Sequence, residues 1–497
     1  MKRTALFLLT LLLTLTAAAQ VDNDAMKRQQ EQMRKRFNSE KDKLKQQYDK
    51  GRRKAEEDFA TFRKKANAEF AEALLKPWTM MSVEPAVPKP KEPAPPQPSK
   101  PQNVEMTKST PLPKSEVVTK VVDTKPLELP PVAEPAPSIP TMQVPFYGTT
   151  CSLHADAGDL RFKLASIDEK NVSEAWKKLS QDKYDGLLHD CIAQRDALLL
   201  SDWGYLRLIG NSCEKLLGKG SNEAVLLQMY LLAQSGYRVR IARMGDKLVL
   251  LVPFNRSIYN YSAVILDGIK HYVLISQKSG KLQVCNVVFP REKVANILMG
   301  HLPNLGVSAK RSRTLQSEKF GTMKATVSVN QRLIDYLNDY PLSDAWEYYA
   351  LAGLSDSVKS VLYPALRSQI EGKSKKKAAN MLLDFVQTAF DYATDHDQFG
   401  YERPLFADES IFFPKNDCED RSIFFAILVR DLLGLDVVLV HWPGHLATAV
   451  AFTDEVEGDY FTIDGRRYTI CDPTYIGASV GMTMPQFKNV DAKLVKL

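Results

Sequence analysis

Cysteines, paired histidines and long apolar runs are all scarce in this chain, and each scarcity excludes a class of protein. Six cysteines in 497 residues are too few for a disulfide scaffold. Basic residues are not interleaved with aromatic ones as in nucleic-acid-binding proteins, so the formal charge of +7 is expected on a solvated surface. Only His441-x3-His445 approaches ligand spacing, and residues four apart in a strand lie too far apart to share a metal. We therefore expect no metal, no cofactor and no nucleic-acid partner.

The one marked apolar run lies at the start of the chain and has the features of a secretory signal. Two basic residues precede the run Ala5–Leu15, and Ala17-Ala18-Ala19 offers a cleavage site of the A-x-A type. The run is short for a membrane span, which needs about 20 residues. An uncleaved anchor is the alternative, whereas a lipoprotein anchor is not expected because no cysteine follows the run. Residues 1–19 thus predict a secreted protein, periplasmic in a bacterium, with no transmembrane span after cleavage.

Residues 20–76 predict one long basic helix. Proline is absent from 25 to 76, and Lys, Arg, Glu, Gln and Ala dominate. At 1.5 Å per residue the helix would be roughly 75–80 Å long. Its sparse apolar residues repeat every eleven positions, which predicts a nearly straight or slightly right-handed seam. The seam is narrow, so we expect a partner: another copy, another coil or an envelope surface. A solvated single helix with i,i+4 charge pairs is the alternative. The two series are Met26, Phe37, Tyr48, Phe59, Phe70 and Met33, Leu44, Ala55, Ala66.

Residues 77–146 are expected to form a disordered, proline-rich linker. They contain 18 of the chain's 28 prolines, mixed with Lys, Glu, Ser and Val. This composition is typical of an extended tether. At about 3.1 Å per residue the tether could reach on the order of 200 Å. Its expected role is to hold the globular part away from whatever the helix engages, and binding of a proline-recognition module is the alternative.

The region 147–328 is predicted to be an α+β domain and a candidate degenerate copy of the C-terminal region described below. Apolar residues at helical spacing give way to short strands near Gly236, and the same order of elements recurs around Gly434. The reactive residues of the second region have no counterparts in the first, so no catalysis is predicted there. Chance similarity between helix-then-strand segments is the alternative. Aligning the two glycines sets Gly220, Lys247 and Ser276 opposite or near Cys418, His445 and Asp472.

In the C-terminal region a thiol, an imidazole and a carboxylate follow one another at equal spacing. Cys418, His445 and Asp472 are each 27 residues from the next. A neutral thiol is a poor nucleophile, whereas an imidazole within reach removes its proton. A carboxylate on the far ring nitrogen fixes the tautomer and stabilises imidazolium. Singly, the three have ordinary explanations as a buried cysteine, a strand terminus and an Asp-Pro turn. Together they predict a cysteine nucleophile that attacks an amide or thioester-type carbonyl.

The local sequence also predicts where each of these residues lies. Asp417 or Asn416 can cap an apolar helix, which leaves Cys418 in the first turn. Free backbone N–H groups and the helix dipole favour thiolate at that position. His445 opens a strand with alanines at alternate positions, so the cysteine helix can approach that face closely. Asp472 follows a later strand, and the proline after it stops the ladder.

Three motifs in this region resemble the transglutaminase-like superfamily. They are Asp417-Cys-Glu-Asp-Arg-Ser422 with its helix, Pro-Gly-His445-Leu-Ala-Thr-Ala-Val450, and Tyr-Thr-Ile-Cys-Asp-Pro-Thr-Tyr475. The resemblance covers 329–497, about a third of the chain. It implies a papain-like α+β core, a catalytic triad of Cys418, His445 and Asp472, and no metal requirement. The family includes protein cross-linkers, peptidases, other amide-cleaving enzymes and members without activity.

Two departures from the family pattern favour hydrolysis over cross-linking. An aromatic residue often stands two places after the family's histidine, where this chain has Ala447. Tryptophan is common shortly before the aspartate, and Tyr468 takes that general place here. The backbone N–H of Cys418 is the natural oxyanion donor. Gln398, Tyr401 and Trp442 are weaker candidates for a side chain that binds the oxyanion or positions substrate.

The leading hypothesis is therefore a secreted cysteine amidase or peptidase that acts on peptide bonds of a protein or cell-envelope substrate. A catalytically silent binding or scaffold protein of the envelope is the first alternative. Acyl transfer to an amine, as in protein cross-linking, is the second. The expected fold is α+β, with a transglutaminase-like core preceded by its candidate copy, a proline-rich linker and a long helix.

Overall fold

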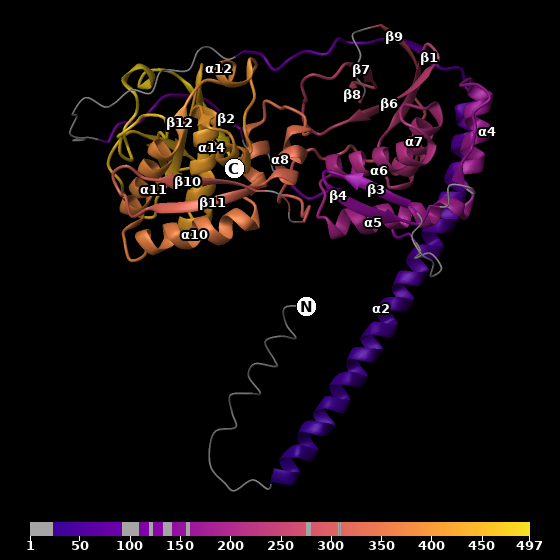
Figure 1. Ribbon diagram of the computed structural model, residues 1–497, viewed down its shortest axis with the longest axis horizontal. Helices are drawn as coiled ribbons and strands as arrows, with labels where there is room; N and C mark the ends of the chain where they lie inside the picture. Colours follow the sequence, from indigo (N-terminus) through magenta and orange to yellow (C-terminus); the bar gives the residue numbers. More distant parts are fainter. Residues whose placement is uncertain are drawn as a thin grey trace. The chain divides into compact units, whose positions relative to one another are not determined.

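One long helix, α2 (Asn23–Leu74), opens the computed structural model and confirms the predicted N-terminal helix (Figure 1). The chain divides within this helix into two units, Met1–Thr61 and Phe62–Leu497. Among the described residues, no helix combines the length and apolar character that crossing a membrane requires. The expected signal peptide and Ser276 lie outside the described residues. The structure describes residues 23–91, 109–118, 123–132, 142–155, 160–274, 280–306, 308 and 310–497.

The apolar seam of α2 differs between the two units. In the first unit Met33, Phe37, Leu44 and Tyr48 are exposed, and so is Ala55. In the second unit Ala66 and Phe70 are buried, and the Phe70 ring lies 4.6 Å from that of Trp176. The Trp176 indole N–H donates to the side-chain oxygen of Asn67 at 3.1 Å. The last turns of the helix are therefore part of the second unit's core, where tertiary packing adds to helix propensity.

We call residues 142–306 the middle region. It begins with a hairpin, continues with helices and ends with a sheet. Ser221 caps the last of these helices by accepting a hydrogen bond from the backbone N–H of Ala224 at 3.1 Å, as the sequence predicts. Its elements are β3 (Met142–Phe146), β4 (Thr149–Leu153), α4 (Glu169–Leu179), η1 (Asp182–Tyr184), α5 (Asp185–Ala197), α6 (Asp202–Leu217), α7 (Asn222–Gln234), β5 (Arg240–Met244), β6 (Lys247–Pro253), β7 (Ala263–Leu266), β8 (Ile269–Val273) and β9 (Lys281–Cys285).

The C-terminal region, residues 308–497, also passes from a hairpin through helices to a sheet. Its elements are β10 (Lys310–Gln316), β11 (Lys324–Asn330), α8 (Gln331–Asn338), α9 (Trp346–Ala352), α10 (Asp356–Ile370), α11 (Lys375–Ala389), β12 (Asp391–Tyr392), α12 (Asp395–Phe399), α13 (Ala407–Phe412), β13 (Lys415–Asn416), α14 (Cys418–Leu428), η2 (Val429–Leu433), β14 (Asp436–Trp442), β15 (His445–Ala451), β16 (Tyr460–Ile463), β17 (Arg466–Cys471), η3 (Pro485–Phe487) and β18 (Ala492–Lys496).

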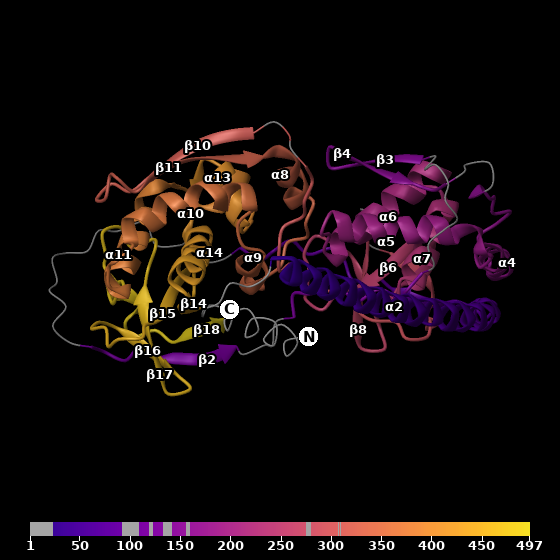
Figure 2. The same cartoon turned by 90° about the horizontal axis from the view of Figure 1, so that it is seen from below.

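The sheets of the two regions have the same strand order. One runs β1-β9-β5-β6-β8-β7 and the other, read from the matching edge, β2-β18-β14-β15-β17-β16. All neighbours in both sheets are antiparallel except β18 and β2, which are parallel. The helix before each sheet packs on its second strand, α7 on β6 and α14 on β15. The chain thus contains one α+β arrangement twice, with helices and sheets in both (Figure 2).

The described parts of the proline-rich segment correct the prediction of a disordered linker. β1 (Thr79–Ser82) pairs with β9 at the edge of the middle sheet. β2 (Lys114–Val118) pairs with β18, and Figure 2 shows it as the purple edge strand of the yellow sheet. Trp78 and Leu112 are buried. Proline is tolerated next to edge strands because one row of their backbone N–H groups has no partner to lose, so a high proline content did not prevent pairing.

The predicted boundary between residues 328 and 329 also needs correction, because it cuts β11. The hairpin β10–β11 packs on α10 and α11 of the C-terminal region. The guanidinium of Arg313 in β10 donates to the backbone oxygen of Phe413 at 2.7 Å. The division therefore falls before the hairpin, near 307, and the core of buried apolar side chains continues from one region into the other.

Candidate active site

Cys418 is the first residue of α14, as the sequence predicts. Asp417 is the cap: its carboxylate accepts hydrogen bonds from the backbone N–H groups of Glu419 at 3.2 Å and Asp420 at 3.5 Å. Asp420 completes the capping box by accepting from the Asp417 backbone N–H at 3.3 Å. Every residue from Cys418 to Leu428 is buried. The start of the helix is thus fixed by hydrogen bonds and by packing on all sides.

His445 and Asp472 form a buried pair. The Nε2 atom of His445 lies 2.8 Å from Oδ2 of Asp472, and both side chains are almost fully buried. The other carboxylate oxygen accepts from the backbone N–H groups of Thr474 at 2.9 Å and Tyr475 at 3.2 Å, which fixes the carboxylate plane. The Nδ1 atom of His445 is buried without a hydrogen-bond partner. The Asp472 carboxylate therefore orients the ring through Nε2, and Nδ1 keeps no hydrogen-bond partner.

Two aromatic rings hold the imidazole in place. Phe487 stacks on His445 with 5.0 Å between ring centres and 10° between planes. Trp442 lies nearly parallel to the imidazole with ring centres 6.1 Å apart, and it also stacks on Phe487. Offset stacking of this kind restricts rotation of the ring. The Asp472 bond and the two aromatic rings thus fix the same imidazole orientation.

The cysteine helix meets the histidine strand closely, as the alanine-lined face predicts. The Ser422 hydroxyl in α14 donates to the backbone oxygen of Leu446 at 2.8 Å. The backbone N–H of Leu446, next to His445, donates toward the Cys418 sulfur and favours its thiolate. Ala447 and Ala449 of β15 are fully buried. Cys418 therefore lies against the first residues of β15, the strand that begins at His445.

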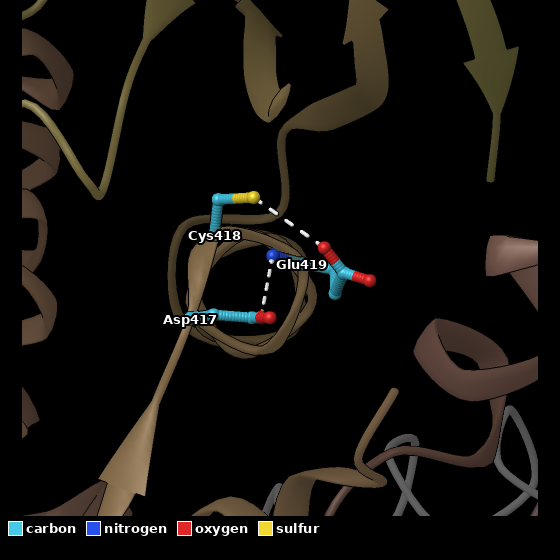
Figure 3. A group of neighbouring side chains, drawn as sticks. All are labelled: Asp417, Cys418 and Glu419. Carbon is cyan, nitrogen blue, oxygen red and sulfur yellow. Dashed lines mark hydrogen bonds between the residues drawn. The ribbon is translucent and has the colours of Figure 1, made fainter. Parts of the chain in front are cut away.

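The prediction that the helix start lowers the thiol pKa is wrong for this resting arrangement. Burial of Cys418 raises its pKa well above the ordinary value, and the carboxylates of Glu419 and Asp417 raise it further. The thiol donates to Oε2 of Glu419 at 3.4 Å, as Figure 3 shows in a view down the helix axis. The desolvation of a buried charge and two nearby negative groups outweigh the helix dipole here.

Carboxylates line the small cavity beside His445. Asp395, Glu402, Asp417 and Glu419 contribute to its wall, together with Trp346 and His441. Its volume of ≈ 20 Å³ is room for about one water-sized group. Burial and the charge of Asp420 raise the pKa of Asp395 to about 10, and burial and the charge of Glu419 raise that of Asp420 to about 7. Burial and the mutual repulsion of these carboxyls therefore favour their protonated forms.

The three weaker candidates for an oxyanion donor have other contacts. Gln398 is paired through both side-chain atoms with the backbone of Lys415, at 3.0 and 3.2 Å. The Trp442 indole N–H donates to the backbone oxygen of Val490 at 3.1 Å. Tyr401 is 50% exposed and lines a different cavity. None of these side chains is brought to His445 as a free donor, although Trp442 does contact the imidazole ring. The backbone N–H of Cys418 stays a prediction.

Sequence reasoning missed a glutamine that supports the aspartate. The Gln387 side-chain N–H groups donate to the backbone oxygens of Asp472, Tyr475 and Ala478 at 3.0, 2.8 and 3.1 Å. Its side-chain oxygen accepts from the Gly477 backbone N–H at 3.1 Å. It thereby fixes the loop that follows Asp472. Gln387 lies mid-helix in α11, and nothing in its local pattern distinguishes it. Glu419 was also missed, although the unbroken acidic run around Cys418 was a signal.

The middle region has different residues at the three matching positions. The first residue of α7 is Asn222, rather than the predicted Gly220, which precedes the cap. Lys247 opens β6, as predicted, and Leu274 follows β8. The Asn222 side chain donates to the backbone oxygen of Asp246 at 3.0 Å and accepts from the backbone N–H of Leu248 at 2.8 Å. An amide, an amine and an alkyl group thus stand where the C-terminal region has thiol, imidazole and carboxylate.

The whole chain was compared with known protein families, curated proteins and solved structures, and none of them matches.

Proposed function

We propose that the C-terminal region is a cysteine enzyme of transglutaminase-like type, with a papain-like core, that hydrolyses amide bonds of a protein or cell-envelope peptide. The observation that carries this proposal is the buried pair of His445 and Asp472. Its 2.8 Å contact through Nε2 leaves Nδ1 unpartnered on the strand that packs against the Cys418 helix. A buried imidazole with one nitrogen held by a carboxylate is the arrangement that a thiol nucleophile needs.

The reaction follows from these contacts. The Cys418 thiol turns from Glu419 toward His445 and gives its proton to Nδ1. The thiolate attacks the amide carbonyl carbon, and Asp472 stabilises the imidazolium. His445 then passes the proton to the leaving amine, and a thioester remains on Cys418. Water, deprotonated by His445, attacks the thioester and releases the acid with the free thiol. An amine in place of water would give acyl transfer, which is the second candidate reaction.

One observation favours a catalytically silent protein instead. Cys418 is only 1% exposed, and its raised pKa keeps the thiol protonated in the resting arrangement. An envelope binding or scaffold protein could retain the fold without turnover. In either case, secretion by residues 1–19 would place the protein outside the cytoplasm.

Alkylation by iodoacetamide near neutral pH separates the two. The enzyme proposal expects Cys418 to react at least about tenfold faster than an ordinary thiol, because a paired thiolate is the reactive species. His445→Ala should remove this advantage. His271→Ala is a matched control, since His271 is also a buried strand histidine, in β8 of the middle region. Labelling of Cys418 at the ordinary rate, equally in wild type and His445→Ala, would support the silent protein.

Mass spectrometry of peptide products distinguishes the two reactions. With added primary amine, hydrolysis yields the free acid and acyl transfer yields the amide adduct. Cys418→Ala must abolish both products.

A further inference from the structure

The acidic cavity beside His445 has the construction of a cation site. One ligand atom from each of Asp395, Glu402 and Glu419 lies within 4.8 Å of the other two. Asp395 and Glu419 are buried and Glu402 is half-buried. All three line the small cavity. A cation between three atoms no more than 4.8 Å apart sits at most about 2.8 Å from each, so small rotations reach the oxygen–metal distances of about 2.3–2.6 Å typical of calcium.

A second observation points to a missing partner for Glu419. Its side chain is 7% exposed, and its Oε1 atom is buried without a hydrogen-bond partner. Figure 3 shows that one carboxylate oxygen faces Cys418 and the other points away from it. An unpaired buried carboxylate oxygen is costly unless a donor or cation satisfies it. Glu419 is also one of the residues that line the cavity.

The nearby arginines do not supply that partner. Within the described residues, Asp395 and Glu419 form no ion pair with arginine or lysine. The Arg403 guanidinium donates to Glu409 at 2.6 Å, and only the Arg403 backbone N–H reaches Asp395. The Arg421 guanidinium donates to the backbone oxygens of Gln387 and Phe390 at 3.2 and 2.7 Å. Neither guanidinium therefore reaches the unpaired Oε1 atom of Glu419.

We propose that Asp395, Glu402 and Glu419 bind a hard divalent cation in this cavity. The donor set is carboxylate oxygen only, which favours hard ions such as Ca²⁺, Mg²⁺ or Mn²⁺ over soft ones. Three carboxylates match a divalent charge better than the single charge of an ammonium group. The cavity volume suits one ion with little room for a ligand chain. Glu419 also accepts from the Cys418 thiol, so the site borders the candidate nucleophile, and its occupancy can be measured without substrate.

Trp346 makes the site testable by luminescence, because it lines the same cavity. Terbium, a hard ion that takes the place of calcium, emits when a nearby excited tryptophan transfers energy to it. The full-length chain should show Trp-sensitised terbium emission that saturates at one ion per chain and that excess Ca²⁺ or Mn²⁺ abolishes. Trp346→Phe should remove most of the emission. Electron paramagnetic resonance should still detect Mn²⁺ bound to that variant with unchanged affinity.

Ligand variants decide whether these carboxylates are the site. Glu402→Gln and Glu419→Gln should each weaken Mn²⁺ binding at least about tenfold. Glu455→Gln, an exposed acid of the same region, is the matched control and should leave it unchanged. Circular dichroism checks that each variant is folded. As a measurement free of variants, Mn²⁺ should raise the melting temperature of wild type and chelator should reverse the rise. Binding that survives both Gln variants, or that falls equally in Glu455→Gln, would overturn the proposal, as would no binding by wild type.

Discussion

In the middle and C-terminal regions the helix before the sheet contacts the same strand of that sheet, α7 on β6 and α14 on β15, but the side chains at the contact differ. In both, the first residue of the helix meets the backbone of the second strand near its start. Asn222 forms two hydrogen bonds there, to Asp246 and Leu248. Cys418 receives only the N–H of Leu446 and gives its own proton to Glu419. In the middle region both polar groups of the Asn222 amide are hydrogen-bonded, whereas in the C-terminal region buried carboxyls surround a buried thiol.

This difference suits two requirements: the amide stabilises the fold, whereas the proposed chemistry needs a thiol. A neutral amide suits this contact between helix and strand better than a thiol does, because it supplies a donor and an acceptor at once. A thiol bonds weakly, and the carboxylates around it repel one another. Sites that carry chemistry commonly break local rules that the rest of the fold obeys. The middle region keeps the scaffold without that cost, so it serves as an internal reference for the following tests.

The largest expected difference between the regions is in turnover. Cys418→Ala should lower amide hydrolysis on the order of 10⁴-fold or more, because no other group can form the thioester. Asn222→Ala should leave turnover unchanged and lower the free energy of unfolding by about 1–2 kcal/mol, because it removes the two hydrogen bonds of a half-buried side chain. Peptide hydrolysis and urea unfolding of both variants measure this. Comparable activity loss in the two variants would end the assignment of Cys418.

The next effect concerns the aspartate. Asp472→Asn should lower turnover by about 10²–10⁴-fold while the fold persists. The asparagine oxygen can still accept from Thr474 and Tyr475, which turns its N–H₂ group toward Nε2 of His445. That contact puts the ring proton on Nδ1, the nitrogen that must accept the thiol proton. The pH profile checks this reason: a change in tautomer lowers the plateau rate, and an unchanged profile with a normal rate contradicts it.

A new thiol in the middle region gives a smaller effect. Asn222→Cys places sulfur at the position that matches Cys418, but Lys247 and Leu274 stand where the histidine and aspartate would be. Iodoacetamide should therefore label residue 222 no faster than an ordinary buried thiol, at least about tenfold more slowly than Cys418. Peptide mapping after timed alkylation measures both sites in one sample. Equal rates would mean that the helix start alone, without imidazole, sets the reactivity.

The smallest expected effect is a change of stability with pH, and it concerns a buried carboxyl such as each region contains. Burial raises the pKa of Asp408 to about 6, and burial also raises the pKa of Asp202 in the middle region, whose carboxylate lies 3.4 Å from Arg195. The folded chain holds the Asp408 proton between about pH 4 and 6, where the unfolded chain has lost it, so this group stabilises the fold less as pH rises. Asp408→Asn should therefore gain stability relative to wild type from pH 4 to 6 and then stay level. Urea unfolding measures this, and the exposed Asp454→Asn should show no such trend.

Much of the site could be predicted because its determinants are local. An acidic cap before an apolar run places Cys418 at a helix start, and alternation along β15 places His445 on the alanine face. The order of helix and strands around Gly236 and Gly434 predicted two similar layouts, and the two sheets do share one strand order. Lys247 and His445 open equivalent strands for this reason. Whether the two regions descend from one ancestor stays a prediction.

The rest could not be predicted because its determinants are distant in sequence. Gln387 acts on a loop about 90 residues away, and no local pattern marks it. Proline content predicted a tether, yet pairing with β9 and β18 recruits two short strands from it. The helix dipole at Cys418 is a local effect, whereas the desolvation that raises the pKa of its thiol depends on the assembled core.

The pairing of β2 with β18 has a consequence for how the chain folds. Lys114 pairs with Ala492, so 378 residues (492 minus 114) separate the partners, and the whole middle region is inserted between them. Contacts between residues so far apart in sequence form late in folding, because closing the long loop between them costs conformational entropy before the contact stabilises the chain. Until β2 is in place, β18 exposes an unpaired edge that can recruit another chain. A fragment that starts near residue 307 lacks β2, so the reactive region cannot be cut free with its sheet intact.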